Sequence, residues 1–323
     1  MDSALLPIAR DVRPTVELAV KPRRTRCLAC GGNGLWAPYP ARLSWLVRCS
    51  GCGLEWIDPQ PPDAELDAIY DADYFQTFGE SDDPRRPYRT LLRARADWFL
   101  MFLNQAEAQV ARGRLLDVGS GVGELLLAAR DRGWEAVGVE PNRAALQRCE
   151  RTVVEMTWPV SIEELPSEEG GFDVVLCSDV LEHLRDPANV LRDFCARLKP
   201  GGLLILTTVN AQGLVTRILG ARWFHYHRDH LWYFTRGSLV RLAQEAGFDR
   251  IRCGVPWKPF HADYILNVLG RRATGRRRSP LGRWLERMRR TLGRRIVRIP
   301  EGLHLAARRP LLAAPGLSAG RRS

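Results

Sequence analysis

The segment from Leu115 to Gly123, LLDVGSGVG, constrains the fold more than any other part of this sequence. Apolar residues typical of a buried strand lead directly into glycines at alternate positions, Gly119, Gly121 and Gly123. Glycine allows a strand to turn sharply into a helix and lets a ligand approach the backbone without meeting a Cβ atom. The segment therefore predicts a strand, a ligand-binding loop and a helix, in that order.

Apolar runs and amphipathic stretches alternate along the rest of the chain. Strands are predicted over 114–118, 135–139, 154–160, 172–177, 203–208 and 248–255, and helices over 88–112, 123–132, 143–151, 187–198 and 238–246. This alternation predicts a parallel sheet wrapped by helices. A chain of 323 residues can bury one such core and carry a small module beside it.

The spacing of the glycines narrows the class of ligand. The order is G-x-G-x-G, and Glu124 stands where a dinucleotide fingerprint has its third glycine. This difference favours an adenosyl ligand without a pyrophosphate. Glu140 ends the next predicted strand, where a carboxylate can accept hydrogen bonds from both hydroxyls of a ribose.

Five motifs in this order resemble those of the class I S-adenosylmethionine-dependent methyltransferases, over about residues 90–310. They are the glycine segment, Glu140, the loop 161–166, the fourth-strand segment 172–187 and the turn 198–202. The resemblance implies an α/β, Rossmann-like fold: a seven-stranded, mostly parallel sheet with helices on both faces and an antiparallel last strand. We expect that strand at 302–308, after an insertion over 259–300.

The resemblance also implies S-adenosylmethionine as the methyl donor. The residues that we expect to bind it are Asp117, Gly119, Ser120, Gly121, Gly123, Glu140, Pro141, Ser161, Ile162, Ser178 and Asp179. The protein then has to hold an acceptor in line with the carbon–sulfur bond and to take its proton where necessary.

Histidines concentrate in the segment FHYHRDHLWYFT at 224–235. An imidazole transfers protons near neutral pH, and an adjacent carboxylate raises its basicity. The segment is similar to a pattern of small-molecule methyltransferases, among them nucleotide-sugar C-methyltransferases that carry an N-terminal zinc module. That similarity implies His230 as the catalytic base and Asp229 as its carboxylate. His183, after the fourth strand, is a further catalytic candidate, and an aromatic cap whose histidines bond to backbone stays an open alternative.

Four of the eight cysteines form two pairs at short spacing, Cys27-x2-Cys30 and Cys49-x2-Cys52. Two such pairs, each with a glycine directly after its second cysteine, predict a structural zinc site with four thiolate ligands. Zinc would fold a segment too small to have its own core. We expect this zinc ribbon to dock on the catalytic domain or to shape the acceptor site.

The net charge of +11 comes from one segment, because residues 271–298 contain twelve arginines and a single acid, Glu286. Over 281–299 apolar residues recur on one side and arginines on the other, which predicts an amphipathic basic helix. Contact with an anionic membrane and packing on the protein stay open alternatives. Nucleic acid is less favoured, because Ser178-Asp179-Val180-Leu181 stands where base amino-methyltransferases carry a Pro-Pro-aromatic motif.

The predicted organisation is an irregular leader over 1–26, a zinc-ribbon module over 27–62, connecting helices over 63–112, a methyltransferase domain over 113–310 and a tail over 311–323. A start without an export signal and the lack of a long apolar run predict a cytoplasmic location, with or without peripheral contact to the inner face of the membrane. The expected activity is methyl transfer to a small molecule: a sugar, a lipid-linked glycan or a secondary metabolite. An RNA methyltransferase and a non-catalytic donor-binding scaffold are the alternatives.

Overall fold

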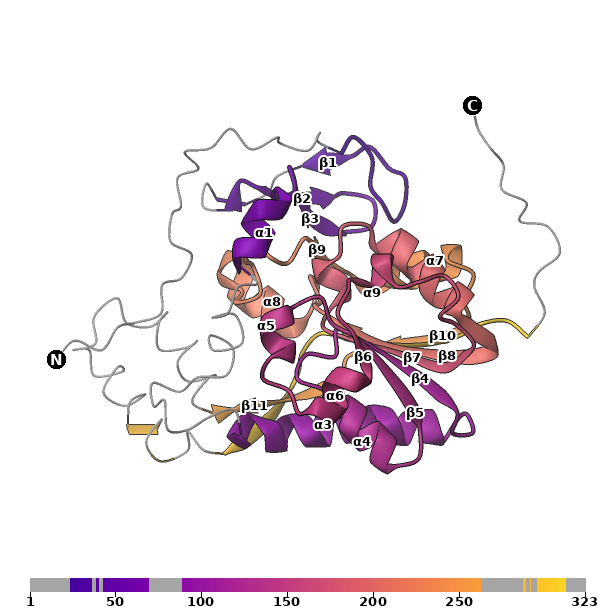
Figure 1. Cartoon of the computed structure of the whole chain (residues 1–323). Coiled ribbons are helices and arrows are strands. Elements are labelled where there is room, and N and C mark those ends of the chain that lie inside the picture. The colour runs from indigo at the N-terminus through magenta and orange to yellow at the C-terminus, as the bar shows by residue number, and fades with distance from the viewer. Residues whose placement is uncertain are drawn as a thin grey trace.

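The computed structural model describes residues 24–36, 39–40, 43–69, 89–262, 287–288, 291 and 295–311 (Figure 1). Its largest sheet has seven strands in the order β10-β13-β8-β7-β4-β5-β6. β13 runs antiparallel to both neighbours, whereas the other neighbouring pairs are parallel. The predicted Rossmann-like sheet is confirmed. Its strands are β4 (Arg114–Val118), β5 (Glu135–Val139), β6 (Thr157–Trp158), β7 (Phe172–Ser178), β8 (Leu198–Thr208), β10 (Asp249–Gly254) and β13 (Leu303–Arg308).

Helices cover both faces of this sheet (Figure 1). Successive residues of β7 point to opposite faces, so Val174 is buried with Phe102 and Leu126 of one layer and Val175 with Phe194 of the other. The first layer contains α3 (Arg89–Glu107), α4 (Glu124–Asp131) and α6 (Arg151–Glu155); the second contains α7 (Pro187–Arg197) and α9 (Arg236–Glu245). Shorter helices lie in the connections: α5 (Arg143–Leu146), α8 (Leu214–Leu219), η2 (Ile162–Glu164), η3 (Leu181–His183) and η4 (Gly220–Arg222).

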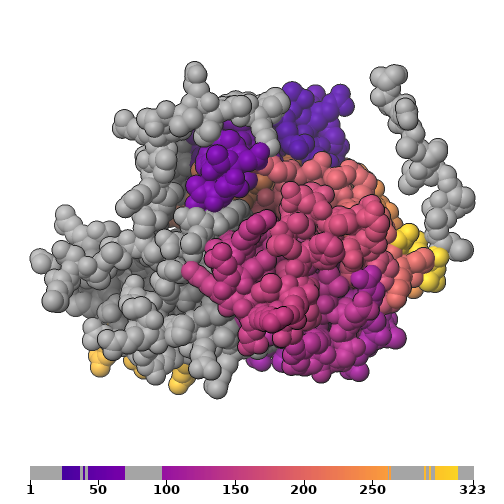
Figure 2. All heavy atoms as spheres, in the orientation of Figure 1, coloured from indigo at the N-terminus to yellow at the C-terminus, as the bar shows by residue number. Residues whose placement is uncertain are grey.

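A second sheet joins the cysteine-bearing segment to the main domain. Its order is β1-β2-β3-β9, and β9 (Trp232–Tyr233) comes from the histidine-rich segment. β3 and β9 are antiparallel, with Glu55 opposite Tyr233 and Trp56 opposite Trp232. The indigo atoms of the cysteine-bearing segment accordingly lie directly on the main domain in Figure 2. The other elements of this part are β1 (Leu35–Trp36), β2 (Leu46–Cys49), β3 (Glu55–Ile57) and α1 (Asp63–Ile69).

The two ends of the predicted insertion pair with each other. β11 (Trp257–His261) and β12 (Ile296–Pro300) form an antiparallel two-stranded sheet. The prediction of a helix over 281–299 is therefore wrong from Ile296 onward, where β-branched residues favour the strand. Arg287, Met288 and Thr291 are helical, and the rest of 281–294 lies outside the described residues.

Three further sequence predictions differ in detail from the structure. The predicted helix 143–151 ends early, as α5, and α6 begins only at Arg151. The predicted strand 154–160 is shortened to β6, because α6 continues to Glu155. β8 begins at Leu198 instead of after the Lys199-Pro-Gly-Gly turn. Among the helices in the described ranges, none has the length and apolar character needed to cross a membrane. The predicted leader over 1–26 lies almost entirely outside the described residues, and so does the tail beyond Leu311.

Candidate active site

The glycine loop between β4 and α4 leaves no space for side chains at two of its positions. Gly119 and Gly123 have φ angles of +73° and +80°, which L side chains rarely adopt. A Cβ atom at Gly119 would lie 2.4 Å from Val180 Cγ2, and one at Gly123 would lie 2.2 Å from Val153 Cγ1. Only glycine therefore lets this backbone lie against its neighbours, as the sequence pattern predicts.

Glu140 follows β5 and reaches back to the glycine loop. Its Oε2 accepts a hydrogen bond from the Gly121 N–H at 2.8 Å, and its Oε1 accepts one from the Asn142 N–H at 2.8 Å. Burial raises the pKa of this carboxyl, and the two backbone hydrogen bonds oppose the shift. The structure thus brings together the glycine loop and the carboxylate that the sequence places beside a ribose.

Four more of the residues expected at the donor site lie along the same edge of the sheet. Asp117 is buried in β4 and Ser120 is buried in the glycine loop. The Ser178 hydroxyl at the end of β7 lies 3.0 Å from Thr207 Oγ1. Asp179 follows with a φ angle of +56°, and its Oδ2 accepts a hydrogen bond from Lys258 Nζ at 2.5 Å.

The remaining three expected donor-site residues lie in loops beside β5 and β6. Pro141 directly follows Glu140 and is exposed. Ser161 is the N-cap of η2 and forms a capping box with Glu164, whose Oε2 accepts hydrogen bonds from the Ser161 N–H and hydroxyl, each at 3.0 Å. Ile162 begins η2 and is buried. This ordered cap holds the loop that the family resemblance places beside the adenine.

Four histidines from two segments meet next to η3, which follows β7. We call His183, His225, His227 and His230 the histidine cluster. The ring centroid of His230 lies 4.6 Å from that of His183, 3.9 Å from that of His227 and 5.5 Å from that of His225. The structure therefore brings the expected catalytic residues His183 and His230 together.

Buried carboxylates and a backbone carbonyl orient these rings. Asp229 accepts a hydrogen bond from His227 Nδ1 through its carboxylate, and from His183 Nδ1 through its backbone oxygen at 2.9 Å. His225 Nε2 lies 3.3 Å from Glu301 Oε1. Within the described part of the chain, the buried Nδ1 of His230 has no hydrogen-bond partner. An unsatisfied buried polar atom is costly, so this nitrogen is available to bond to a polar group of a ligand or to water.

The electrostatic environment keeps His230 neutral. Burial and the neighbouring histidines hold the pKa of His230 well below its usual range. Burial and the charge of Asp179 raise the pKa of Glu182 to about 8, and Thr208 Oγ1 donates a hydrogen bond to its Oε2 at 2.7 Å. Burial opposes ionisation of Asp229, yet the contacts with His227 and His183 hold its pKa below the usual range.

Sequence reasoning missed two charged residues of this site, Lys258 and Glu301. Lys258 lies in β11 and is partly buried, and Glu301 directly follows β12 and is buried. Burial lowers the pKa of Lys258, but Asp179 and Glu301 raise it above its usual value. The sequence carries no signal for them, because only the pairing of the two ends of the insertion brings them to the histidine cluster.

The four predicted zinc ligands also come together. Cys27 Sγ lies 3.4 Å from Cys52 Sγ, and Cys30 Sγ lies 3.5 Å from Cys49 Sγ. All four sulfur atoms lie within 4.8 Å of one another. The two cysteine turns have the same backbone pattern, in which Gly31 N donates to Cys27 O and Gly53 N donates to Cys49 O, each at 2.9 Å.

The sheet order, its single antiparallel strand and the glycine loop with its carboxylate define a Rossmann-like, S-adenosylmethionine-dependent methyltransferase. Residues 85–252 match the family model described as a methyltransferase domain, and the chain belongs to this family.

Two curated relatives are named ubiquinone biosynthesis O-methyltransferase. The protein of Alkalilimnicola ehrlichii is 35% identical over 196 residues, which cover 56% of this chain and 77% of the relative. The protein of Ralstonia nicotianae is 29% identical over 195 residues, which cover 56% and 80%. A solved S-adenosylmethionine-dependent methyltransferase from Archaeoglobus fulgidus matches 73% of this chain and all of its own at 19% identity, with a TM-score of 0.47.

Proposed function

We propose that this protein transfers the methyl group of S-adenosylmethionine to a hydroxyl oxygen of a small-molecule acceptor. The observation that carries this proposal is the buried imidazole of His230, whose Nδ1 has no partner among the described residues. Burial also holds the pKa of His230 well below its usual range, which favours the neutral form. A neutral imidazole suits the removal of a hydroxyl proton. The names of the curated relatives support oxygen as the methylated atom.

The proposed donor site consists of the glycine loop, Asp117, Ser120, Glu140 with Pro141, Ser161 with Ile162, and Ser178 with Asp179. When bound, S-adenosylmethionine supplies an electrophilic methyl group. The glycine loop leaves its backbone accessible, and Glu140 accepts hydrogen bonds from the ribose hydroxyls. Lys258 pairs with Asp179 and compensates its charge. The donor site can therefore hold the Asp179 carboxylate in addition to that of Glu140.

For the acceptor, we propose His230 as the base, with His183 and Asp229 positioned around it. The acceptor oxygen forms a bond to the methyl carbon as the carbon–sulfur bond breaks, and the sulfur keeps the electron pair. His230 Nδ1 takes the hydroxyl proton. The Asp229 carboxylate accepts a hydrogen bond from His227, whose ring centroid lies 3.9 Å from that of His230, so its negative charge favours the resulting imidazolium.

The composition of the site also favours a polar acceptor. The histidine cluster, Asp229, Glu301 and Lys258 offer hydrogen-bond donors and acceptors in a desolvated environment. Such groups match the hydroxyls of a sugar, of a lipid-linked glycan headgroup or of a phenolic secondary metabolite. An acceptor without hydroxyls would leave them unpaired, which costs binding free energy.

Two measurements test the proposed function. Calorimetry with S-adenosylhomocysteine should detect binding by the wild type, and Glu140→Ala should weaken binding by about 1.5–3 kcal/mol, because it removes hydrogen bonds to a charged group. A donor-consumption screen across nucleotide sugars, phenols and glycolipid headgroups then identifies the acceptor. If the wild type does not bind S-adenosylhomocysteine, the proposal fails at its first step.

We further propose that Cys27, Cys30, Cys49 and Cys52 hold a structural zinc ion. In a tetrahedral site with zinc–sulfur bonds of about 2.3 Å, the sulfur atoms are about 3.8 Å apart. The separations of 3.4 and 3.5 Å within two of the pairs fit this arrangement. One equivalent of zinc per chain, measured by atomic emission after dialysis, supports the proposal, and its loss in Cys30→Ser is the matching control.

A peripheral membrane contact through 281–299 stays a prediction, since most of that segment lies outside the described residues. Sedimentation with vesicles of phosphatidylglycerol and phosphatidylcholine tests it. Deletion of 271–294 should lower the bound fraction if the prediction holds, and an unchanged fraction contradicts it.

A further inference from the structure

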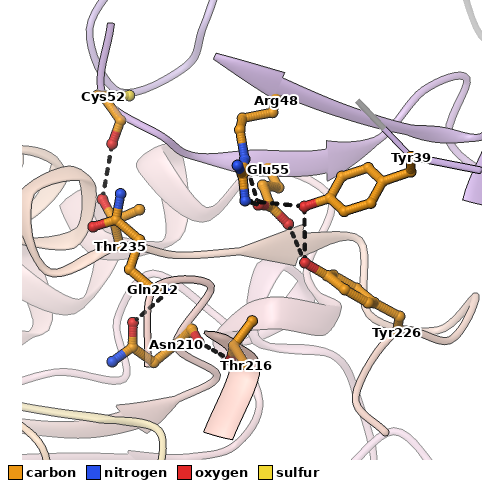
Figure 3. Close-up of polar contacts among 9 residues, drawn as sticks. All are labelled: Tyr39, Arg48, Cys52, Glu55, Asn210, Gln212, Thr216, Tyr226 and Thr235. Atoms are coloured by element: carbon orange, nitrogen blue, oxygen red, sulfur yellow. Dashed lines mark hydrogen bonds and ion pairs between the residues drawn. The ribbon is translucent and has the colours of Figure 1, made fainter. Parts of the chain in front are cut away.

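A buried carboxylate of the cysteine-bearing segment reaches toward the histidine-rich segment (Figure 3). Glu55 of β3 is fully buried, and its Oε2 accepts a hydrogen bond from Tyr226 Oη at 2.7 Å. Arg48 Nε donates to Glu55 Oε1 at 2.7 Å. Tyr39 Oη completes the network, 2.9 Å from Tyr226 Oη and 3.1 Å from an Arg48 nitrogen.

Tyr226 stands between two members of the histidine cluster, His225 and His227. Its ring centroid lies 5.0 Å from that of Tyr233 and 5.1 Å from that of Trp223. Tyr233 is fixed by the pairing of β9 with β3, and its hydroxyl donates to His227 O at 2.9 Å. The backbone that carries His225 and His227 is thus held from the cysteine-bearing segment at two points.

Further hydrogen bonds join the cysteine-bearing segment to the histidine-rich segment. Ile57 N donates to Leu231 O at 3.0 Å, directly after His230. Thr235 Oγ1 donates to Cys52 O at 3.0 Å (Figure 3), and Arg228 Nε donates to Glu65 Oε1 at 2.6 Å. The cysteine-bearing segment therefore contacts the histidine-rich segment along its whole length.

We propose that Glu55 is a positioning residue of the acceptor site, which acts by holding Tyr226 and, through it, His225 and His227. The inference rests on the proposed function, because it treats the histidine cluster as the acceptor side. It gives the cysteine-bearing segment a role in binding the acceptor but not in binding the donor.

Glu55 is better explained by a role in fixing the position of Tyr226 than by a contribution to the stability of the fold. A buried ion pair costs desolvation free energy, and apolar residues of similar volume often stabilise a fold as well or better. Burial raises the pKa of Glu55, while its contacts with Tyr39, Arg48 and Tyr226 lower it. What the carboxylate adds is direction: a hydrogen bond fixes the Tyr226 hydroxyl at one point, whereas apolar packing alone does not.

The test uses the full-length, zinc-containing protein and the variant Tyr226→Phe, which keeps the ring and removes only the hydroxyl. Histidine reactivity toward diethyl pyrocarbonate is measured residue by residue by mass spectrometry. Trp36→Ala is the matched control, since Trp36 is exposed in β1 at the far edge of the same sheet. His304 of β13, which stacks on Phe102, is the internal reference.

We expect the labelling rates of His225 and His227 to rise about ten-fold in Tyr226→Phe, the effect of losing one hydrogen bond to a charged group. His230, whose ring lies against both, should follow, whereas His304 and the affinity for S-adenosylhomocysteine should stay within about two-fold of the wild type. Glu55→Gln, whose amide oxygen still accepts from Tyr226, should fall between wild type and Tyr226→Phe. Against an acceptor identified by the screen, kcat/KM should fall about ten-fold in Tyr226→Phe at an unchanged KM for the donor.

Two outcomes overturn the inference. Labelling of His225 and His227 at the wild-type rate means that Tyr226 does not hold them. A parallel rise at His304 together with weaker S-adenosylhomocysteine binding means that the network supports the whole fold and not the acceptor site. The footprint needs no acceptor, so a failure of this inference can be distinguished from a failure of the proposed function, which the binding and methyl-transfer assays report separately.

Discussion

Replacing Gly119 by alanine tests whether close packing under the glycine loop builds the donor site. At a φ angle of +73° a side chain is strained, and its Cβ would lie 2.4 Å from Val180 Cγ2. The left-handed conformation costs about 1–2 kcal/mol. Forcing extra volume into a packed site adds about 1–3 kcal/mol. Alanine also restricts the unfolded chain, which offsets about 0.4–1 kcal/mol.

Gly171 provides the matched control. Its φ angle is +69°, and no heavy atom lies within 4 Å of the position of an added Cβ. The backbone strain and the effect on the unfolded chain are therefore nearly equal in the two substitutions. The difference between their free energies of unfolding isolates the clash with Val180. We expect Gly119→Ala to lower the free energy of unfolding by about 1–3 kcal/mol more than Gly171→Ala does.

Urea unfolding followed by circular dichroism measures this difference, and calorimetry with S-adenosylhomocysteine measures the donor site. Only Gly119→Ala should weaken binding. Adding Val180→Ala to Gly119→Ala removes the atom that clashes, so the double variant should lose less stability than the sum of the two single changes. Equal destabilisation at Gly119 and Gly171, or simple additivity with Val180→Ala, would refute this account of the loop.

Three further predictions concern the acceptor side and the cysteines. His230→Ala should lower kcat for the acceptor by about 100-fold or more, the contribution of a general base, and leave the affinity for S-adenosylhomocysteine unchanged; near-normal turnover removes His230 as the base. Because burial raises the pKa of Glu182 from 4.5 to about 8, the folded state binds a proton that the unfolded chain releases. The stabilisation is complete below pH 4.5 and lost as pH rises through about 8. Glu182→Gln should therefore flatten the fall of the unfolding free energy with pH between these values. An unchanged dependence of the unfolding free energy on pH contradicts this prediction. Removing zinc with a chelator should increase proteolysis within residues 24–69 before the donor affinity changes, because the ion would fold that segment, and equal resistance with and without chelator argues against a structural metal.

The donor half of the site could be predicted from the sequence because its parts are consecutive. The glycine loop follows β4 and Glu140 follows β5, and each residue occupies a fixed place in a strand-loop-helix unit. The carboxyl ends of neighbouring parallel strands meet at one edge of the sheet, so the order of the motifs is enough to bring the residues together. The antiparallel β13 after an insertion is expected from the family resemblance.

The acceptor half depends on pairings between distant segments. Glu55 and Tyr226 are 171 residues apart along the chain, and Asp179 and Lys258 are 79 apart. No periodicity or local spacing records such a contact, because β3 pairs with β9 and β11 with β12 only after the chain has folded. The predicted helix failed at Ile296 partly for the same reason: β-branched residues there favour a strand, but the partner strand β11 that pairs with β12 lies outside any local window.

The donor half of the site comes from consecutive motifs and the acceptor half from distant segments, and this difference affects how the acceptor is selected. Two parts of the chain outside the consecutive strand-helix units each contribute buried charge beside the histidine cluster: Glu55 from the cysteine-bearing segment, and Lys258 with Glu301 from the ends of the insertion. None of the three belongs to the glycine loop or to the Glu140 turn. A change at one of them leaves a buried partner uncompensated, which is far more costly than losing the pair together. Acceptor preference should therefore respond to joint replacement of Glu55 and Arg48, while donor binding remains unchanged.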